Sequence, residues 1–259
     1  MDKVYVIGDV HGHLKKLQHL LRDAQLMDAA DQWIGKQALL CFIGDYVDRG
    51  PDSIACLTLI MELQRQAEQV GGRVLTLLGN HDVGILSAYF LQSEPSDGPG
   101  GTFLRDWERN GGRKNDLRLL TATHVEWMLR QPAMARHGDL LLVHADATLY
   151  YQYGNTIEEV NRNIAAVLHG RDGEAWDYLL EQFGNRMDFI DDDVLDREGT
   201  AEARHFLKQY GGTRIVHGHT PIMKITGKRA VEVTKPLIYA EGLCVNVDGG
   251  MYLGGSGFI

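Results

Sequence analysis

Side chains that are able to bind metal ions follow short apolar runs along this chain of 259 residues. Five of the runs lead into the segments GDVHG, GDYVDRG, GNHD, LLLVHA and VHGHT. The candidate ligands in these segments are Asp9, His11, Asp45, Asn80, His81, His144, His217 and His219. Open α/β sheets gather the loops that follow their strands at one edge. We therefore expect these side chains to meet in a metal site that acts on phosphate.

The residue types fit a centre with two metal ions. Two ions about 3.5–4 Å apart need a shared ligand, and a carboxylate with two oxygens suits that role. Asp45 is the expected bridge, while Asp9 and His11 lie two residues apart on one turn and are able to hold one ion. Asn80, His144 and one histidine of VHGHT would hold the other ion. Nitrogen and oxygen ligands without thiolate favour manganese, iron or zinc.

The elements that must position these residues follow an α/β pattern. Apolar strands are predicted at residues 4–7, 39–43, 74–78 and around Leu140. Helical periodicity and start signals predict helices at residues 14–26, 52–66 and 83–91. Three strand–loop–helix units within the first hundred residues indicate a layered α/β sheet.

The middle of the chain has a different pattern. The segment SEPSDGPGG at 93–101 is expected to be a loop. Further helices are predicted at residues 103–109, 124–130, 156–168 and 176–183. We expect one domain over 1–259 with a helical, cap-like insertion at about 93–190. From Arg214 onward, strands are expected to alternate with glycine-rich turns, and the last apolar run, CVNVDGG, carries no ligand that we would name.

Composition limits the partners. The net charge is −9, which gives no electrostatic basis for binding nucleic acid or an anionic membrane. Apolar residues make up 44% of the chain, enough for a large core, but no apolar run reaches the roughly 20 residues of a membrane span. Cys41, Cys56 and Cys244 show no CxxC spacing, and no signal-peptide pattern opens the sequence. We expect a cytoplasmic protein.

Three of the motifs resemble those of a known family. GDVHG at 8–12, GDYVDRG at 44–50 and GNHD at 79–82 follow one another at intervals of about 35 residues. They resemble the motifs of the phosphoprotein phosphatase family of calcineurin-like metallophosphoesterases. The segments LLLVHA, HGHTP and NVDGG follow in the expected order, so the resemblance covers nearly the whole chain. It extends to small bacterial members of the serine/threonine phosphatase type and of the diadenosine-tetraphosphatase type.

The resemblance implies a role for each candidate residue. The ligands of the first metal would be Asp9, His11 and Asp45. The ligands of the second metal would be Asp45, Asn80, His144 and His219. It also implies that Arg49 grips the phosphate and that His81, oriented by Asp48, acts as general acid. His217 is then expected to support the site or to face solvent rather than to bind metal.

Two further elements are less specific. A second phosphate-binding arginine is usual in this family, and Arg186 in FGNRMDF is the candidate, with a surface or structural role as the alternative. The segment WERNGG at 107–112 resembles an element that lies near the site in bacterial members. Its role is open, and Trp107 would otherwise be a core residue.

The fold that the resemblance implies is a layered β-sandwich flanked by helices, with a helical insertion. The activity that it implies is hydrolysis of a phosphomonoester by direct attack of a metal-bridging hydroxide, and the cofactors are two divalent ions. Mn²⁺ is preferred, and Fe or Zn is possible. The substrate would be a phosphorylated protein or a small phosphoester.

Three hypotheses for the function stay open. The leading hypothesis is a serine/threonine protein phosphatase, and the alternative is a bis(5'-nucleosyl)-tetraphosphatase or another hydrolase of small phosphoesters or pyrophosphates. The aspartate of GNHD is common in the tetraphosphatase branch and favours that alternative. A nucleotide site would need stacking groups, for which Tyr150, Tyr151 and Tyr153 are available unless they belong to the core. A binding module without activity is the third hypothesis, and the intact set of candidate ligands argues against it.

Overall fold

Two β-sheets form the centre of the computed structural model, which describes residues 3–259. The first sheet is parallel and has the order β1 (Val4–Ile7), β2 (Leu39–Phe42), β3 (Arg73–Thr76). The second has the order β4 (Met134–His137), β5 (Leu140–Val143), β6 (Arg214–His217), β8 (Cys244–Asn246), β7 (Leu237–Tyr239). In the second sheet β5, β6 and β8 are parallel, and the two edge strands are antiparallel to their neighbours.

The register brings the carboxyl ends of the parallel strands to one level within each sheet. In the first sheet Ile7 pairs with Phe42, which in turn pairs with Thr76. In the second, His217 pairs with Asn246. Every loop that carries a predicted ligand therefore leaves its sheet from the carboxyl edge.

Side-chain alternation along the strands divides the core in two. Leu39, Cys41 and Ile43 belong to a small apolar cluster that also contains Leu142 and Val216 of the second sheet. Their neighbours in the sequence, such as Leu40 and Phe42, belong to the larger cluster on the helical side. Because successive side chains point to opposite faces of a strand, the two sheets face each other across the small cluster. The predicted layered α/β sandwich is confirmed.

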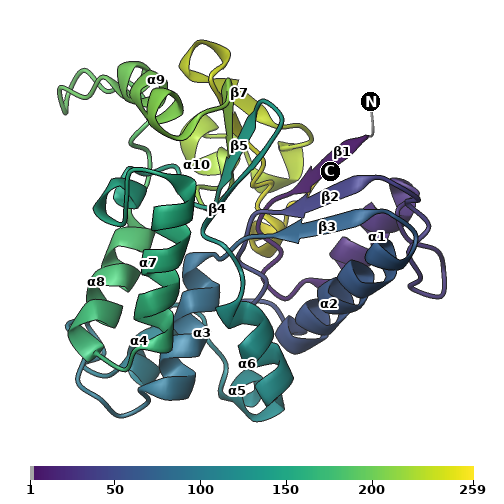
Figure 1. The fold of residues 1–259 in the computed structure, drawn as a ribbon, viewed down its shortest axis with the longest axis horizontal. Helices are drawn as coiled ribbons and strands as arrows, with labels where there is room; N and C mark the ends of the chain where they lie inside the picture. Colours follow the sequence, from purple (N-terminus) through teal and green to yellow (C-terminus); the bar gives the residue numbers. More distant parts are fainter. Residues whose placement is uncertain (1–2) are drawn as a thin grey trace.

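Helices cover the first sheet and build the middle of the chain. The helices after the first two strands are α1 (Leu14–Asp23) and α2 (Ser53–Gln69), which lie beside β1–β3 (Figure 1). The helical region that follows contains α3 (Asn80–Phe90), α4 (Phe103–Arg109), α5 (Lys114–Leu119), α6 (Ala122–Leu129), α7 (Ile157–His169) and α8 (Gly173–Gly184). It occupies the lower part of the view in Figure 1.

The remaining helices lie in the last quarter of the chain and around the second sheet. They are α9 (Gly199–Tyr210) and α10 (Ile222–Thr226). The 3₁₀ helices are η1 (Leu149–Gln152), η2 (Ala230–Glu232), η3 (Ala240–Gly242) and η4 (Met251–Leu253). No helix among residues 3–259 has both the length and the apolar character needed to cross a bilayer.

Most predicted elements are present, with ends that differ by up to a few residues. The predictions missed α5, α9 and β4. α5 has six residues and buries only Asp116, so it shows no apolar period. α9 buries Ala203, Phe206, Leu207 and Tyr210 at helical spacing but follows a run of acids that resembles a turn. The β4–β5 hairpin lies inside the range 93–190, so that range holds two strands as well as α4–α8.

Candidate metal centre and its cavity

The loops that leave the two sheets converge on one buried site. The six predicted metal ligands that meet there are Asp9, His11, Asp45, Asn80, His144 and His219. All of them except Asn80 are at most 5% exposed, and Asn80 is partly buried. Two groups of possible ligand atoms can be defined, namely His11–Asp45–His81 and Asp45–His144–His219. Asp45 belongs to both groups.

Three of these residues have backbone conformations that favour glycine. The φ angles of His11, Asp45 and His219 are 46°, 56° and 65°. Such left-handed conformations cost other residues about 1–3 kcal/mol each and occur where the surrounding structure enforces them. Here the His11 N–H donates to the Asp45 carbonyl at 2.9 Å, and the His219 N–H donates to Asp9 Oδ1 at 2.9 Å. The turns thus hold one another in the shape that gathers the side chains.

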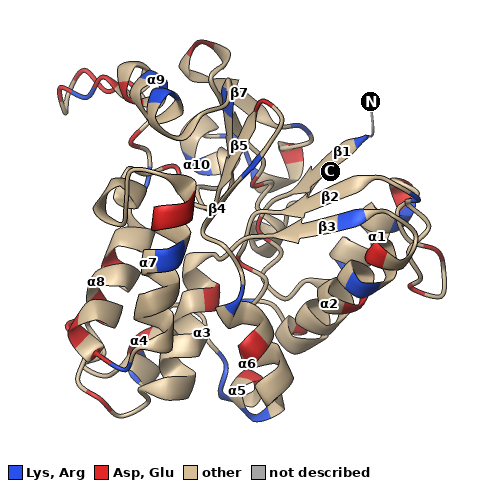
Figure 2. Ribbon diagram, in the orientation of Figure 1, with Lys and Arg blue, Asp and Glu red and all other residues tan. Residues whose placement is uncertain are grey.

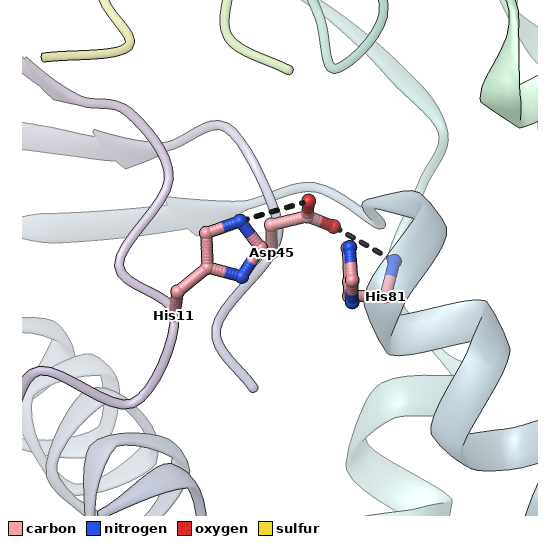
Figure 3. A group of neighbouring side chains, drawn as sticks. All are labelled: His11, Asp45 and His81. Carbon is pink, nitrogen blue, oxygen red and sulfur yellow. Dashed lines mark hydrogen bonds and ion pairs between the residues drawn. The ribbon is translucent and has the colours of Figure 1, made fainter. Parts of the chain in front are cut away.

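The first group is shown in Figure 3, where His11 and His81 flank Asp45. His11 Nε2 lies 3.6 Å from Asp45 Oδ2 and 3.7 Å from Asp9 Oδ2. His11 Nδ1 lies 3.0 Å from the carbonyl oxygen of Val47, so the ring donates there. That contact leaves the lone pair of a neutral ring on Nε2, on the side of the two carboxylates.

The second group has the same arrangement. His144 Nδ1 donates to the carbonyl oxygen of Ile43 at 2.8 Å, so a neutral ring again carries its lone pair on Nε2. This Nε2 lies 3.1 Å from Asn80 Oδ1 and 3.5 Å from Asp45 Oδ1. Asn80 Oδ1 is also 2.9 Å from His219 Nδ1, and among residues 3–259 the buried His219 Nε2 has no hydrogen-bond partner.

The donor atoms fit divalent cations. Burial lowers the pKa of His11, His144 and His219, which favours the neutral rings that bind metal. Burial would raise the pKa of Asp45, but the surrounding imidazoles outweigh it and hold that pKa below its usual value. Burial, Asp248 and Asp45 raise the pKa of Asp9. Lone pairs and carboxylates that face one another in a buried site need a cation between them, and the residues present fit metal ions.

Asp45 is supported by Asp82, the last residue of GNHD. The Asp82 carboxylate accepts the N–H groups of Asp45 at 2.8 Å, Tyr46 at 3.0 Å and Gly79 at 2.9 Å. Asp45 Oδ1 in turn accepts the N–H of His81 at 2.9 Å, in the first turn of α3. A Cβ on Gly79 would clash with the Asp45 carboxylate, so only glycine permits this approach of α3.

His81 belongs to a chain of hydrogen bonds that extends beyond the expected pair with Asp48. His81 Nδ1 donates to Asp48 Oδ2 at 2.8 Å. The other oxygen, Asp48 Oδ1, accepts the indole N–H of Trp107 at 2.8 Å. Trp107 is therefore both buried and directly connected to the site. Its position in WERNGG was the only sequence signal for this contact.

Arg49 lies on the open side of the first group. Its Nη1 donates to His11 Nε2 at 3.1 Å, and its Cζ lies 4.1 Å from the centre of the Tyr252 ring. The Tyr252 ring also packs against His11, with 4.8 Å between the ring centres. A tyrosine face under a guanidinium restricts its position and favours its charge. Tyr252 lies between the glycine pairs of GGMYLGGSG and was not among the candidates from the sequence.

Other predicted candidates lie outside the ligand groups. His217 Nδ1 donates to the Gly218 carbonyl at 3.0 Å, and its Nε2 accepts the Tyr239 hydroxyl at 2.8 Å, so it supports the second sheet. Tyr150, Tyr151 and Tyr153 pack in the larger core or against it, and none lines the site cavity.

The sixth apolar run contributes a residue that we did not name as a candidate. Asp248 is fully buried, and burial raises its pKa to about 7, with Asp45 adding to the effect. Asp248 Oδ1 accepts the Gly250 N–H at 2.8 Å, while Oδ2 is buried without a partner. The signal that could have identified it is the DGG turn itself, which holds this acid at the end of β8 next to the site.

A cavity of about 1180 Å³ opens from the site. At its inner end are Asp48, Arg49, Asn80, His81 and Arg186. Its walls come from α3, α4, α8 and the loop between α3 and α4. Arg186 therefore lines the same cavity as Arg49 and His81.

Comparison with known proteins agrees with this geometry. Residues 2–223 match the model of the family described as calcineurin-like phosphoesterase. The chain is 35% identical over 234 residues to Shewanella-like protein phosphatase 1 of Plasmodium berghei (strain Anka), covering 84% of this chain and 61% of that protein. It is 31% identical over 192 residues to the symmetrical bis(5'-nucleosyl)-tetraphosphatase of Janthinobacterium sp. (strain Marseille), covering 73% and 59%. The chain thus spans about three fifths of the length of these two curated relatives.

A solved structure extends the likeness of the fold to the whole chain. The cold-active protein-tyrosine phosphatase of a psychrophilic Shewanella species superposes with a TM-score of 0.73 at 21% identity. The superposition covers 99% of this chain and 76% of that one. At this level of identity, the comparison supports the fold rather than the substrate.

Asp45→Asn tests the shared ligand. An amide has one acceptor oxygen and no charge, so we expect the affinity for Mn²⁺ to fall at least about tenfold and the bound stoichiometry to drop. Calorimetric titration of metal-free protein with Mn²⁺ measures both. Asp139→Asn, which changes an exposed acid, is the control and should bind as the parent does. Unchanged stoichiometry and affinity in Asp45→Asn would contradict a shared Asp45 ligand.

Proposed function

The chain belongs to the calcineurin-like phosphoesterase family, and on that premise we propose that it is a metal-dependent phosphomonoesterase of the serine/threonine protein phosphatase type. The observation that carries the proposal is the shared position of Asp45 between two imidazole groups, beside the His81–Asp48 pair. A buried bridge flanked by a hydrogen-bonded histidine is an arrangement suited to cleaving a phosphoester.

The family implies divalent metal ions. We propose two, with Mn²⁺ preferred over Fe or Zn. Asp9, His11 and Asp45 would hold the first, and Asp45, Asn80, His144 and His219 would hold the second. When bound, such ions supply a water of lowered pKa and neutralise phosphoryl oxygens.

The protein's own groups would then complete the chemistry. His81 lies at the inner end of the cavity, and its Nδ1 is held by Asp48, so Nε2 is the atom available to protonate the leaving oxygen. Asp48 fixes the tautomer and the ring orientation, and Trp107 fixes Asp48. The attacking water supplies the oxygen that bonds to phosphorus and loses a proton. His81 supplies the proton that the leaving oxygen takes up, so the hydrolysis is balanced.

Two arginines would bind the phosphoryl oxygens. Arg49 is placed by His11 and Tyr252, and its planar guanidinium is able to donate two parallel hydrogen bonds. Arg186 lines the same cavity. Burial and His144 lower the pKa of His219 most, and the nearby charge of Arg186 lowers it further. We assign Arg186 the second contact with the phosphate.

The alternative function is hydrolysis of a bis(5'-nucleosyl) tetraphosphate or another small phosphoester. The 31% identity to a symmetrical bis(5'-nucleosyl)-tetraphosphatase favours it. Against it, the three tyrosines first considered for stacking on a nucleotide belong to the core region and do not line the cavity, although its lining includes Tyr178.

We also propose how the chain is organised and where it works. Residues 1–259 would form one metallophosphoesterase domain with a cap-like insertion at about 93–190. Cys41, Cys56 and Cys244 are free, buried thiols, which suits the reducing conditions of the cytoplasm.

A hydrolysis panel with added Mn²⁺ tests the proposed activity. It compares phosphoserine and phosphothreonine peptides, phosphotyrosine peptides, diadenosine tetraphosphate and p-nitrophenyl phosphate. We expect kcat/KM for the phosphoserine or phosphothreonine peptides to exceed that for diadenosine tetraphosphate by about tenfold or more. Faster turnover of the dinucleotide would favour the alternative function, and a preference for phosphotyrosine would overturn the serine/threonine assignment.

His81→Ala tests the general acid. Loss of the proton donor should lower kcat on phosphoserine peptides by about 10²–10⁴-fold, because an alkoxide is a poor leaving group. The decrease on p-nitrophenyl phosphate should be much smaller, and bound Mn²⁺ should stay the same. His19→Ala removes an exposed histidine and serves as control. Equal losses on both substrates would argue against the acid role.

Trp107→Phe tests the support of Asp48 without opening a large cavity. Loss of the indole N–H should lower kcat on phosphoserine peptides by about tenfold, the order expected for a hydrogen bond to a charged group. The effect should nearly vanish in the His81→Ala background. Trp127→Phe is the matched control, because it also loses a buried indole hydrogen bond, to Gln64, away from the site. Equal effects of the two tryptophan variants would contradict the assignment.

A further inference from the structure

The cavity that opens from the site carries opposite charges at its two ends. Arg49 and Arg186 lie at the inner end with His81. Besides these residues and Asp48, the lining includes one further arginine and seven acids, namely Glu94, Asp97, Asp106, Asp172, Glu174, Asp177 and Glu181. The outer walls of the cavity are therefore strongly acidic.

One wall is a face of α8. Glu174, Asp177 and Glu181 lie three and four residues apart, so they share one side of the helix, and all three line the cavity. Figure 2 shows acidic positions in red along α8. A second wall is the loop between α3 and α4, which is hydrogen-bonded to Asp177 of α8 and contributes Glu94 and Asp97.

Some of these acids have structural roles and others are free. Asp106 and Asp177 both accept the Ser96 hydroxyl, at 2.7 Å and 2.9 Å, and so fasten the loop to α4 and α8. Among the ion pairs of residues 3–259, none involves the remaining exposed acids of the two walls. These free acids are Glu94, Asp97, Glu174 and Glu181.

The third arginine does not neutralise the wall acids directly. Arg171 Nη1 donates to the carbonyl oxygens of Leu168 and Gly170 at 3.1 Å and 2.6 Å. Its guanidinium also lies 3.6 Å from the centre of the Phe90 ring. It is thus held at the end of α7, and the charge of the outer cavity stays negative.

The position of the His81 ring indicates what the cavity receives. His81 is 3% exposed, and within the described chain its Nε2 has no hydrogen-bond partner although the residue lines the cavity. On the function proposed above, this atom faces the leaving oxygen. The part of the substrate attached to that oxygen then lies between the acidic walls. The volume of about 1180 Å³ is larger than a phosphate group needs and leaves room for several flanking residues.

We propose that the cavity selects phosphoserine or phosphothreonine peptides that carry lysine or arginine close to the phosphorylated residue. The inner arginines would take the phosphate, and the free acids of α8 and of the α3–α4 loop would take the basic side chains. The same walls repel the additional phosphates of a dinucleoside polyphosphate. This inference rests on the proposed phosphatase activity and adds the flanking sequence that the enzyme prefers.

Matched phosphoserine peptides with basic, neutral or acidic flanks test the proposal. We expect kcat/KM to be about tenfold higher for the basic peptide than for the neutral one at low salt, and lower still for the acidic peptide. The preference should shrink in 0.5 M NaCl, where the Debye length falls to a few ångströms, about 3–5 Å. Phosphocholine and diadenosine tetraphosphate complete the panel.

Charge variants of α8 assign the effect to the wall. In Glu174→Gln/Glu181→Gln, the ratio of kcat/KM for basic over neutral peptide should fall towards one. In Glu174→Lys/Glu181→Lys, it should drop below one. The control, Glu126→Gln/Glu158→Gln, removes two exposed acids that do not line the cavity and should keep the parental ratio. Circular dichroism of each variant shows whether it is folded.

The outcomes separate this inference from the proposed function. If no peptide and no aryl phosphate is hydrolysed, the proposed function fails. If peptides are hydrolysed without a preference for basic flanks, or if the control pair lowers the ratio as much as the α8 pair, only the selectivity fails. Phosphocholine or diadenosine tetraphosphate turned over as well as the basic peptide would overturn the assignment to peptides.

Discussion

The rest of the site depends on the burial of one carboxylate, that of Asp45, among four imidazoles. Its φ of 56° is unfavourable for an aspartate, and the backbone is held in that state by Asp82 and by the loop after β1. The imidazoles of His144, His81, His11 and His219 keep the pKa of Asp45 low in spite of burial. A buried charge of this kind is costly unless it is compensated, and here its partners come from both sheets. The sandwich is therefore also the frame that keeps the candidate ligands at a fixed separation.

The convergence of the candidate ligands could be predicted from the sequence, because loops that follow neighbouring parallel strands leave the sheet at the same edge. Each of the GDVHG, GDYVDRG and GNHD segments follows a strand, and the strands end in register. Choosing between His217 and His219 needed more than spacing. His217 is still within β6 and points to Tyr239, whereas His219 follows the strand and turns into the site at φ 65°. The residue types alone do not show which of the two histidines lies after the end of the strand and turns towards the site.

The residues that the sequence did not reveal reach the site from distant segments. Trp107 comes from α4, Tyr252 from η4 and Asp248 from the end of β8. Their contacts depend on how the helical region and the last turns pack, and packing leaves no local pattern in a chain. For the same reason β4 was missed, since it is defined by its pairing with β5 more than by its own pattern. The local sequence motifs predicted the candidate ligands, whereas the groups that orient these ligands come from long-range packing.

The charges that line the cavity also come from two kinds of element, the strand loops and the helical region. The strand loops collect Arg49 and the candidate metal ligands, and these loops are fixed by the sheets. The acids of α8 and of the α3–α4 loop lie on elements that the sheets do not constrain, so their charges are able to change without disturbing Asp45. A protein of net charge −9 gains nothing from general attraction of phosphate, and any attraction must be local and screened within about 8–10 Å. On the proposed function, positive charge at the inner end and negative charge on the walls would orient a substrate of mixed charge and reject one that is anionic throughout.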